Sequence, residues 1–255
     1  MDIEPTAGPH RIAMWSGPRN ISTAMMRAWE SRPDTFVVDE PFYAHYLAQT
    51  GLPHPGVEEI LRHHPSDADA VTADLLGRTE QDDAGAPLTI FYQKHMAHHL
   101  LDGMIGPWLG GLRHAFLIRH PAEMLRSLHR VTPHPTVTDT GLPQQVELLS
   151  YVETTFGSAV PILDAKDVLE APGPMLEALC ARLGVAYDPA MLAWRSGPRA
   201  SDGIWARYWY ASVEASESFG PYRPPQGPFP SELSDVLEAC MPLYNQLFSR
   251  RIEAP

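Results

Sequence analysis

The chain has 255 residues, of which 44% are hydrophobic and 20% are charged, which is typical of one large globular domain. Its formal net charge of −12 argues against nucleic acid or an anionic membrane as a partner, because such binding depends on neutralising phosphate charge. The first residues lack a signal-peptide pattern, and no apolar run reaches the roughly 20 residues of a membrane span. We therefore expect a cytoplasmic protein with a single domain over residues 1–255.

The basic residues are almost all arginines. Only Lys94 and Lys166 are lysines among the 19 basic residues, so a site for an anionic ligand would depend mainly on arginine. The planar guanidinium suits this role because it binds phosphate through two parallel hydrogen bonds. Cys180 and Cys240 lie in apolar helical patterns without metal-binding or redox spacing, so we expect two buried thiols.

The first predicted elements are a strand at residues 12–15 and a helix that begins at Ser22, joined by a tight turn at residues 16–18. A strand that enters a helix through such a turn directs several backbone N–H groups at one point. Arg19 adds a fixed charge there, and Ser22 and Thr23 add hydroxyls that can cap the helix. The pattern predicts a phosphate or sulfate site, with an ordinary strand-turn-helix and a surface arginine as the alternative. No Gly-Lys-Ser/Thr closes the loop, which argues against an ordinary ATPase loop.

Acidic residues follow the second predicted strand, residues 35–38. Asp39 and Glu40 come at its carboxyl end, where open α/β sheets place their ligand sites. The next segment, residues 43–56, is rich in tyrosine and histidine. We expect it to be an excursion over the site whose polar aromatic residues line an acceptor pocket, or a plain surface loop.

Ionisable residues also follow the third predicted strand, residues 88–92, which comes after a helical stretch at 57–76 and a loop at 82–87. Lys94, His95, His98 and His99 crowd its end. His95 and His99 have the i, i+4 spacing of metal ligands, but no third ligand and no H-E-x-x-H glutamate accompany them. We therefore expect no metal site.

The fourth predicted strand, residues 113–118, ends at Arg119, and the following helix at 122–130 carries Ser127. A separation of eight residues lets this arginine and this hydroxyl converge on one anion if the chain turns back between them. Unrelated surface side chains are the alternative. Residues 132–143, rich in proline and threonine, are predicted to form a loop that can act as a mobile lid.

The remaining chain continues the alternation of strands and helices. We expect helices at 144–157, 174–183, 188–194 and 231–252, a fifth strand at 160–163, an aromatic and basic loop at 195–210, and an extended proline-rich segment at 220–230. Gly184 is predicted to cap the helix that ends at Leu183. Strands that alternate with helices predict an α/β fold with a mostly parallel central sheet and helices on both faces.

These motifs resemble those of the sulfotransferases that use 3′-phosphoadenosine 5′-phosphosulfate (PAPS), over most of the chain. The 5′-phosphosulfate loop of that family is similar to the run Gly17, Pro18, Arg19, Asn20, Ile21, Ser22 and Thr23. Arg119 with Ser127 resembles the 3′-phosphate motif, and residues 167–169 with the helix to Gly184 resemble the family's Glu-Asp-Leu to Leu-Gly segment. The resemblance implies a P-loop-like sulfotransferase fold.

The resemblance also implies roles for residues outside these motifs. Arg199, in a segment similar to the family's basic-Gly-Trp stretch, would be a further ligand of the 3′-phosphate. Two positions depart from the family pattern: Asn20-Ile21 replaces Ser-Gly, and Lys94-His95-Met96 replaces Lys-x-His. The base of many cytosolic members therefore does not transfer directly to His95. Tyrosine-protein sulfotransferases place a glutamate after the second strand, where Glu40 falls.

The activity that the resemblance implies is sulfuryl transfer from PAPS to a hydroxyl or amine of a small-molecule acceptor, without a metal. Arg19 would stabilise charge on the leaving phosphate, Lys94 would reach the bridging oxygen, and Glu40 would take the acceptor proton, with His95 as the alternative base. Two other readings remain open: a P-loop kinase-like phosphotransferase, and a non-catalytic protein that binds the nucleotide. Neither the acceptor nor the oligomeric state follows from the sequence.

Overall fold

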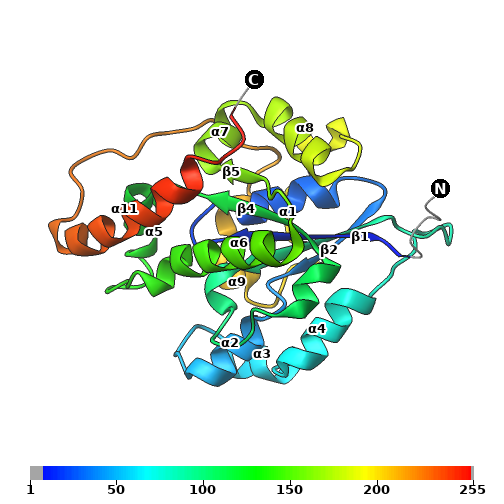
Figure 1. Cartoon of the computed structure of the whole chain (residues 1–255), viewed down its shortest axis with the longest axis horizontal. Coiled ribbons are helices and arrows are strands. Elements are labelled where there is room, and N and C mark those ends of the chain that lie inside the picture. The colour runs from blue at the N-terminus through cyan, green and yellow to red at the C-terminus, as the bar shows by residue number, and fades with distance from the viewer. Residues whose placement is uncertain (1–7, 254–255) are drawn as a thin grey trace.

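The computed structural model describes residues 8–253 and is built on a five-stranded parallel sheet with the strand order β2-β3-β1-β4-β5 (Figure 1). The strands are β1 (His10–Ser16), β2 (Thr35–Asp39), β3 (Ile90–Met96), β4 (Arg113–Ile118) and β5 (Ile162–Asp164). Because β1 is central, the loop that follows it lies between the ends of β3 and β4. This sheet confirms the α/β fold that the alternating pattern predicts.

Helices connect the strands and cover both faces of the sheet. The α-helices are α1 (Ser22–Glu30), α2 (Tyr43–Thr50), α3 (Val57–His63), α4 (Ala68–Gly77), α5 (Pro121–Leu128), α6 (Leu142–Phe156), α7 (Ala165–Glu170), α8 (Pro172–Leu183), α9 (Ala206–Trp209), α10 (Ala211–Glu214) and α11 (Ser234–Phe248). Short 3-10 helices are η1 (Ala97–His99), η2 (Pro107–Gly111), η3 (Thr138–Thr140), η4 (Pro189–Leu192) and η5 (Ser231–Leu233). Among the described residues, no helix is long and apolar enough to cross a membrane.

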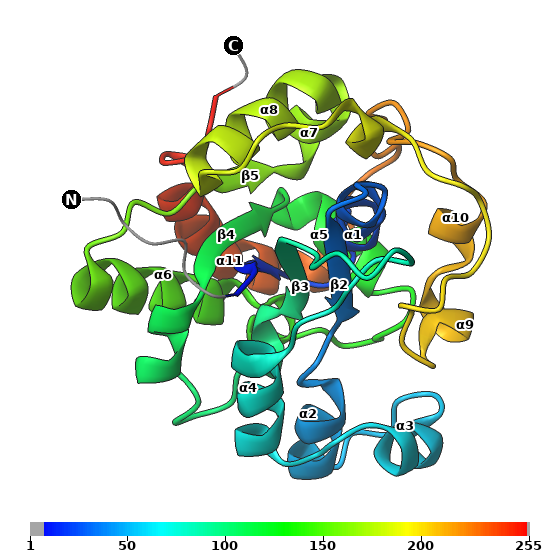
Figure 2. The same ribbon diagram turned by 90° about the vertical axis from the view of Figure 1, so that its right-hand side faces the viewer.

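Alternating side chains of the strands build a core on each face of the sheet. Ile12 and Met14 of β1 pack in one core with α1 and α8, whereas Ala13 and Trp15 pack in the other with α4, α6 and α11. The two helix layers lie on opposite sides of the sheet (Figure 2). Because successive side chains of β1 point to opposite faces of the sheet, neighbouring residues contribute to different cores.

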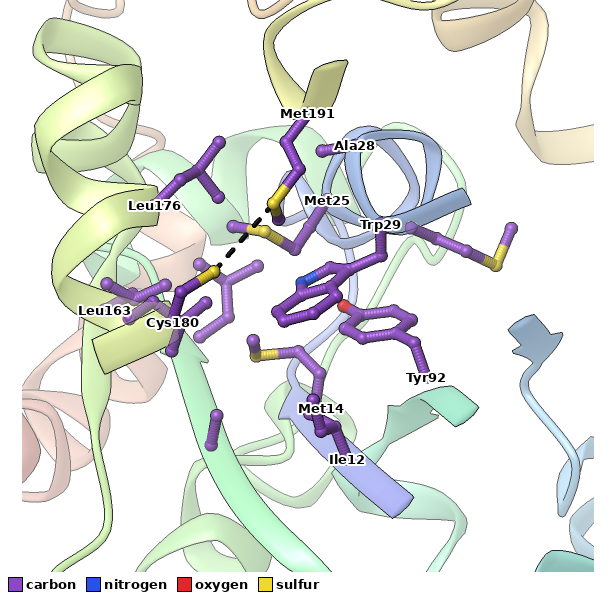
Figure 3. Packing of buried hydrophobic residues seen from close by; sticks show 14 of the residues in the cluster. Ile12, Met14, Met25, Ala28, Trp29, Tyr92, Leu163, Leu176, Cys180 and Met191 are labelled. Carbon is purple, nitrogen blue, oxygen red and sulfur yellow. Dashed lines mark hydrogen bonds between the residues drawn. The ribbon is translucent and has the colours of Figure 1, made fainter. Parts of the chain in front are cut away.

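The core under α1 is rich in sulfur and aromatic groups (Figure 3). The ring of Trp29 stacks on that of Tyr92 with centroids 5.2 Å apart, and the Cys180 Sγ lies 3.9 Å from the Met191 sulfur. Cys180 and Cys240 are both fully buried, as predicted. This packing anchors α1, the helix whose N-terminus faces the loop after β1.

The segment after β2 begins with a helix, which the expectation of an excursion or a surface loop at residues 43–56 did not include. Residues 43–50 form α2 because Tyr43, Ala44 and Leu47 recur at helical spacing and bury one face. That face packs against Trp205 and Tyr210 in a third hydrophobic cluster. The loop at 195–210 is therefore anchored to α2, and it contains the short helix α9.

Strand β3 continues to Met96, beyond the predicted end at residue 92. The extension contains Gln93, Lys94 and His95, which are polar but buried. Each has a polar partner inside the protein; for example, Gln93 Nε2 donates to the Leu75 carbonyl at 3.1 Å. Buried polar groups of this kind are stable only when paired. The partners of Gln93 and Lys94 come from distant segments, whereas His95 pairs with Gln93 on the same strand.

Candidate active site

The loop between β1 and α1 is shaped by Arg19 and Asn20. The backbone of Arg19 is left-handed, with φ of 54°. The Asn20 side chain donates to the Leu117 carbonyl at 2.9 Å and accepts from the Ile21 N–H at 2.9 Å. The turn therefore forms without the Ser-Gly pair, because an asparagine side chain ties it to β4.

Position 17 requires glycine because the backbone of Thr140 lies too close for a side chain. A Cβ added at Gly17 would lie 2.3 Å from the carbonyl oxygen of Thr140, a contact that real structures do not contain. Thr140 is fully buried and belongs to η3, so the segment before α6 lies directly on the start of the loop.

The N-terminus of α1 is free to receive an anion. Its first backbone bond runs from Met25 N–H to Ile21 C=O, and no side chain caps the helix, contrary to the expectation for Ser22 and Thr23. Within residues 8–253, the backbone N–H groups at 22–24 and the hydroxyls of Ser22 and Thr23 donate to no protein group. Unpaired donors at a helix N-terminus favour phosphate or sulfate.

The structure brings Arg19, Arg119 and Ser127 together beside this terminus. Arg19 Nε donates to Ser127 Oγ at 3.0 Å, and Arg119 Nη1 donates to the carbonyl of Arg19 at 2.9 Å. Arg119 Nε also donates to the Glu123 carboxylate at 3.1 Å. Burial lowers the pKa of Arg19, and the nearby cations of Arg119 and Arg130 lower it further. An anion bound here would relieve that repulsion between cations.

A cavity of about 420 Å³ adjoins these residues and is lined by four arginines. We call it the arginine cavity; its lining includes Arg119, Ser127, Arg126, Arg130 and Arg223. Sequence reasoning missed the last three. Arg126 and Arg130 carried a signal, because both lie within three residues of Ser127 in the sequence.

Arg223 reaches the arginine cavity from the proline-rich segment at 220–230, in orange in Figure 1. Arg126 donates to the carbonyls of Gln226 and Gly227 at 3.2 and 2.8 Å, and Tyr222 donates to Glu123 at 2.6 Å. These bonds fasten the segment across α5. Nothing local in the sequence links residue 223 to this helix.

Arg199 lies elsewhere. It does not line the arginine cavity, and its Nε lies 3.7 Å from the carboxylate of Glu30. Glu30 is the last residue of α1, whereas the anion site lies at the first, so about 12 Å of helix separates the two ends. The structure therefore does not bring Arg199 together with Arg119 and Ser127.

A second cluster lies at the carboxyl end of β2 and β3. The Lys94 ammonium contacts three acceptors: Asp39 Oδ1 at 2.8 Å, Glu40 Oε1 at 2.5 Å and the Tyr210 hydroxyl at 2.7 Å. Tyr210 in turn lies 2.8 Å from Asp39 Oδ2, and Trp205 donates to its oxygen at 3.3 Å. All three hydrogens of the ammonium are thus matched to partners within the protein. Burial lowers the pKa of Lys94, but the two carboxylates outweigh it and raise the pKa above its usual value.

Glu40 is the carboxylate of this cluster that remains reachable. Its side chain is 12% exposed, compared with 1% for Asp39. Only its Oε1 is hydrogen-bonded within the described residues, so Oε2 is available. Burial raises the pKa of Glu40; Lys94 opposes this and Asp39 reinforces it, with a net rise. Asp39 and Tyr210 are members of the cluster that sequence reasoning did not assign.

His95 points to the opposite face of β3 from Lys94. Its ring stacks on Trp15 with centroids 4.1 Å apart, and the side chain is buried. Burial, with the neighbouring His114 and Lys94, lowers its pKa to about 3. The structure therefore places His95 in the core under α6, apart from Lys94 and Glu40.

The two clusters lie at the same edge of the sheet. Asp39 is level with Lys94, and Lys94 is level with Met14, two residues before the end of β1. Neighbouring strands are about 4.8 Å apart, so β2 and β1 are separated by about 10 Å. Within residues 8–253, no three His, Cys, Asp or Glu side chains gather in a way that could hold a metal ion.

Comparison with known proteins identifies relatives of the chain. A family model described as "Sulfotransferase domain" matches residues 10–251. Two Arabidopsis thaliana proteins named branched-chain-amino-acid aminotransferase-like protein 1 and 2 are 33% and 32% identical over 243 and 240 residues. These matches cover 95% and 92% of this chain but only 42% and 41% of the plant proteins, so the chain spans about two fifths of their length.

Solved structures share the fold. The sulfotransferase domain from the curacin biosynthetic pathway aligns with a TM-score of 0.52 at 14% identity, covering 98% of this chain and 100% of that domain. A sulfotransferase from Alicyclobacillus acidocaldarius aligns with a TM-score of 0.54 at 13% identity, covering 97% and 98% of the two chains.

Proposed function

The chain belongs to the sulfotransferase domain family, and from this membership we propose that it moves a sulfuryl group from PAPS to a hydroxyl or amine of a small acceptor. One observation carries the proposal. Arg19, Arg119 and Ser127 converge at an uncapped helix N-terminus, next to a cavity lined by four arginines, in a chain with a net charge of −12.

The residues present fit a nucleotide that carries phosphate at two positions. The loop of residues 17–23 offers unpaired N–H groups and hydroxyls for the 5′-phosphosulfate. The arginine cavity offers separate cations for a 3′-phosphate, namely those of Arg119, Arg130 and Arg223. A cavity lined by four arginines beside this loop favours a bisphosphate over a nucleotide with 5′-phosphates alone.

PAPS would supply a sulfuryl group whose bond to the 5′-phosphate is weak enough to be broken without a covalent intermediate on the protein. The remaining demands are positioning and charge stabilisation, by analogy with phosphoryl transfer. Arg19 and the N-terminus of α1 are placed to stabilise negative charge on the leaving phosphate. We assign them that role.

Glu40 is the proposed general base. Its free Oε2 and raised pKa suit a group that takes a proton from the acceptor near neutral pH. The Lys94 contacts support a different role from the one that the family resemblance implies. Lys94 would have to leave one of its three partners to reach a bridging oxygen, so we propose that it holds Glu40 in place.

The names of the plant relatives raise aminotransfer as another possibility. Such enzymes form a Schiff base through a lysine that is neutral and accessible. The chain has two lysines. Lys94 is buried and held by two carboxylates, and Lys166 lies on α7, half-exposed and 3.8 Å from Glu170. Neither environment favours a nucleophilic amine, and the match covers only part of those relatives.

The test measures binding and transfer separately. Calorimetry should show that 3′-phosphoadenosine 5′-phosphate binds far more tightly than AMP, and that Arg119→Ala weakens this binding roughly ten- to a hundredfold. Arg223→Ala should weaken it similarly, whereas Arg199→Ala, a matched loss of one arginine, should change it little. Equal affinity for AMP and the bisphosphate would contradict the proposal. Formation of the desulfated nucleotide from PAPS with pools of acceptors, indifferent to chelators, then tests catalysis.

A further inference from the structure

Asp39, the last residue of β2, has a buried carboxylate whose two oxygens are both occupied. Its Oδ1 accepts from the Lys94 ammonium at 2.8 Å. Its Oδ2 accepts from the Tyr210 hydroxyl at 2.8 Å and from the Gly203 N–H at 3.1 Å. A single carboxylate therefore joins β3 to the distant segment that covers the end of β2, directly beside Glu40.

Two of the three groups that bind Asp39 also contact Glu40, and both contact the same oxygen. The Lys94 ammonium lies 2.5 Å from Glu40 Oε1, and the Tyr210 hydroxyl oxygen lies 3.3 Å from that atom. Within residues 8–253, Glu40 Oε2 receives no hydrogen bond, and it is not among the unpaired atoms that are shielded from solvent. Glu40 is thus held through one oxygen, and its other oxygen can be reached.

The segment that contacts Asp39 is itself fixed to the sheet. Asp202 precedes Gly203, and its two oxygens lie 2.7 Å from the guanidinium nitrogens of Arg27 on α1. The Arg27 side chain is fully buried, and breaking a buried ion pair is costly. The N–H group of Gly203 therefore cannot easily move away from Asp39.

The charge of Asp39 also affects how strongly Glu40 binds a proton. An ammonium in contact with a single carboxylate lowers the pKa of that carboxyl by about 1–3 units. Here the Lys94 ammonium is shared between two carboxylates, so its effect on Glu40 is partly offset. Burial is the largest cause of the raised pKa of Glu40, and Asp39 adds to it against Lys94. A base with a pKa nearer the working pH is more effective.

Other ionisable side chains lie around the two carboxylates, on several elements: Arg27 of α1, Tyr43 of α2, His64 after α3, Tyr92 of β3 and Tyr210 after α9. Burial raises the pKa of the three tyrosines, so they are neutral near pH 7. Ion pairing raises the pKa of Arg27, which stays charged. Burial lowers the pKa of His64 from 6.5, so it can titrate in the same range as Glu40 and an experiment must separate the two.

We propose that Asp39 is a positioning residue, which holds Lys94 and Tyr210 against one oxygen of Glu40 and leaves the other oxygen free for the proton of the acceptor. This inference rests on the proposed function, in which Glu40 is the general base. Asp39 acts through Glu40 and Lys94, because its own side chain is 1% exposed and both of its oxygens are occupied.

The test uses nuclear magnetic resonance of the lysine side chains, because the chain has only two lysines. The Lys94 ammonium contacts Glu40, so its ¹⁵N shift reports whether Glu40 is ionised. Lys166→Arg assigns the signal, and Glu40→Gln should remove the titration step, which separates Glu40 from His64. In Asp39→Asn, the midpoint of that step should move to lower pH by about one unit or more. An unchanged midpoint, or a move to higher pH, would overturn the inference.

A matched control is Asp164→Asn, which alters another buried carboxylate at the end of a strand. Asp164 accepts from the Tyr244 hydroxyl at 2.9 Å, and three strands separate β5 from β2, a distance of roughly 19 Å. The midpoint should not move in this variant. A measurement on the labelled parent keeps the test decisive if Asp39→Asn does not fold. Couplings across hydrogen bonds should join the Lys94 nitrogen to the carboxyl carbons of both Asp39 and Glu40, and absence of the coupling to Asp39 would overturn the inference.

Transfer kinetics separate this inference from the proposed function. In Asp39→Asn, the acid limb of the kcat/KM profile should move to lower pH together with the midpoint of the Lys94 signal. The kcat value should fall about threefold or more, because a weaker base takes the proton less readily. If the signal shifts but the acid limb does not, or if the parent transfers no sulfuryl group, the proposed function is wrong and the positioning of Glu40 by Asp39 still stands.

Discussion

Two residues other than glycine have a left-handed backbone in the described chain, and both lie in the candidate site. Arg19 has φ of 54° and Glu40 has φ of 41°. Such conformations cost about 1–3 kcal/mol each when a Cβ is present, and they persist where surrounding contacts enforce them. Here the Asn20 amide and the Lys94 carbonyl, which accepts from the Glu40 N–H at 2.8 Å, enforce them. The strain aims both side chains at the carboxyl edge of the sheet.

Glu40→Gln tests the proposed base while keeping its shape. Transfer should fall by roughly a hundredfold or more because the amide cannot accept the acceptor proton. Calorimetry should show that 3′-phosphoadenosine 5′-phosphate binds nearly as before, since Glu40 lies outside the arginine cavity. A variant that transfers at close to the parent rate would remove Glu40 from this role, and loss of transfer in His95→Asn would then assign it to the histidine.

Tyr210→Phe tests a positioning role for the Tyr210 hydroxyl. The hydrogen bond from this hydroxyl lowers the pKa of Glu40, so its removal should raise that pKa. Activity depends on the ionised base, so the acid limb of the kcat/KM profile should move to higher pH, and kcat should fall about three- to tenfold. The control is Tyr208→Phe, which alters an exposed ring and should leave the profile unchanged. An unshifted profile in Tyr210→Phe would limit this residue to packing.

At the scale of elements, the site is formed by segments that pack over the carboxyl ends of strands and over the elements that follow them. The loop after β1 is covered by η3, α5 is crossed by the proline-rich segment, and the end of β2 is covered by residues 203–210. Gln145 of α6 adds a further tie, donating to the carbonyl of Trp15 at 2.9 Å. Two of these segments contribute polar side chains to the site, Arg223 from the proline-rich segment and Tyr210 from residues 203–210, so fold and site depend on the same contacts.

Gly17→Ala tests the contact between η3 and the loop that joins β1 to α1. The new methyl group would overlap the Thr140 carbonyl, which is backbone and cannot rotate away. We expect a displaced loop, with binding of 3′-phosphoadenosine 5′-phosphate weakened at least about tenfold, and a lower melting temperature. Gly77→Ala at the end of α4 is the matched control, because nothing lies within 4 Å of the added carbon. Equal nucleotide affinity in the two variants would show that the loop tolerates the shift.

At the scale of the whole molecule, positively and negatively charged side chains are separated in space. A chain with a net charge of −12 gathers four arginines around one cavity and two carboxylates around another. Long-range repulsion from the acidic surface would slow an anionic nucleotide, and the local arginines offset it at short range. Raising the salt concentration screens both effects. It weakens the long-range repulsion, which speeds association of the nucleotide, and it weakens the attraction to the arginines, which lowers the affinity.

Buried neutral histidines predict that acid destabilises the fold. Burial lowers the pKa of His95 to about 3 and that of His114 to about 4, whereas both titrate near 6.5 when unfolded. Between these values the unfolded state binds more protons, so their stabilising contribution is complete above pH 6.5 and is lost as the pH falls. From pH 7 to 5, each histidine should cost about 2 kcal/mol of unfolding free energy.

Urea unfolding at pH 7 and pH 5 checks this expectation by comparing variants. His114→Gln should reduce the loss of stability between the two pH values by about 2 kcal/mol relative to the parent. His134→Asn, a change at an exposed loop position, should leave the loss unchanged. Buried carboxyls such as Asp164, whose pKa burial raises, act in the opposite direction and are common to all three proteins. The same pH slope in His114→Gln and the parent would contradict the assignment.

Much of the fold could be predicted because its signals are local. Apolar runs identify the five strands, helical spacing identifies α1, α6 and α8, and Gly184 caps α8 with φ of 69°. The prediction failed for α2 and for the end of β3, where polar residues are buried. A sequence pattern reports polarity, whereas Lys94 is stable in a buried strand only because Asp39 and Tyr210 reach it.

The sequence by itself determined the parallel α/β architecture, the turn between β1 and α1, and the nearness of Arg119 to Ser127, which line one cavity, because each depends on residues within about one strand-helix unit. Only the tertiary structure decided that Tyr210 joins Lys94, that Arg223 lines the arginine cavity, and that Arg199 contacts Glu30 instead. These partners are separated by about a hundred residues or more along the chain, and the segments that carry them have no periodic pattern. Their positions follow from how the core packs α2 against residues 203–210 and α5 against the proline-rich segment, and such long-range contacts leave no local signal.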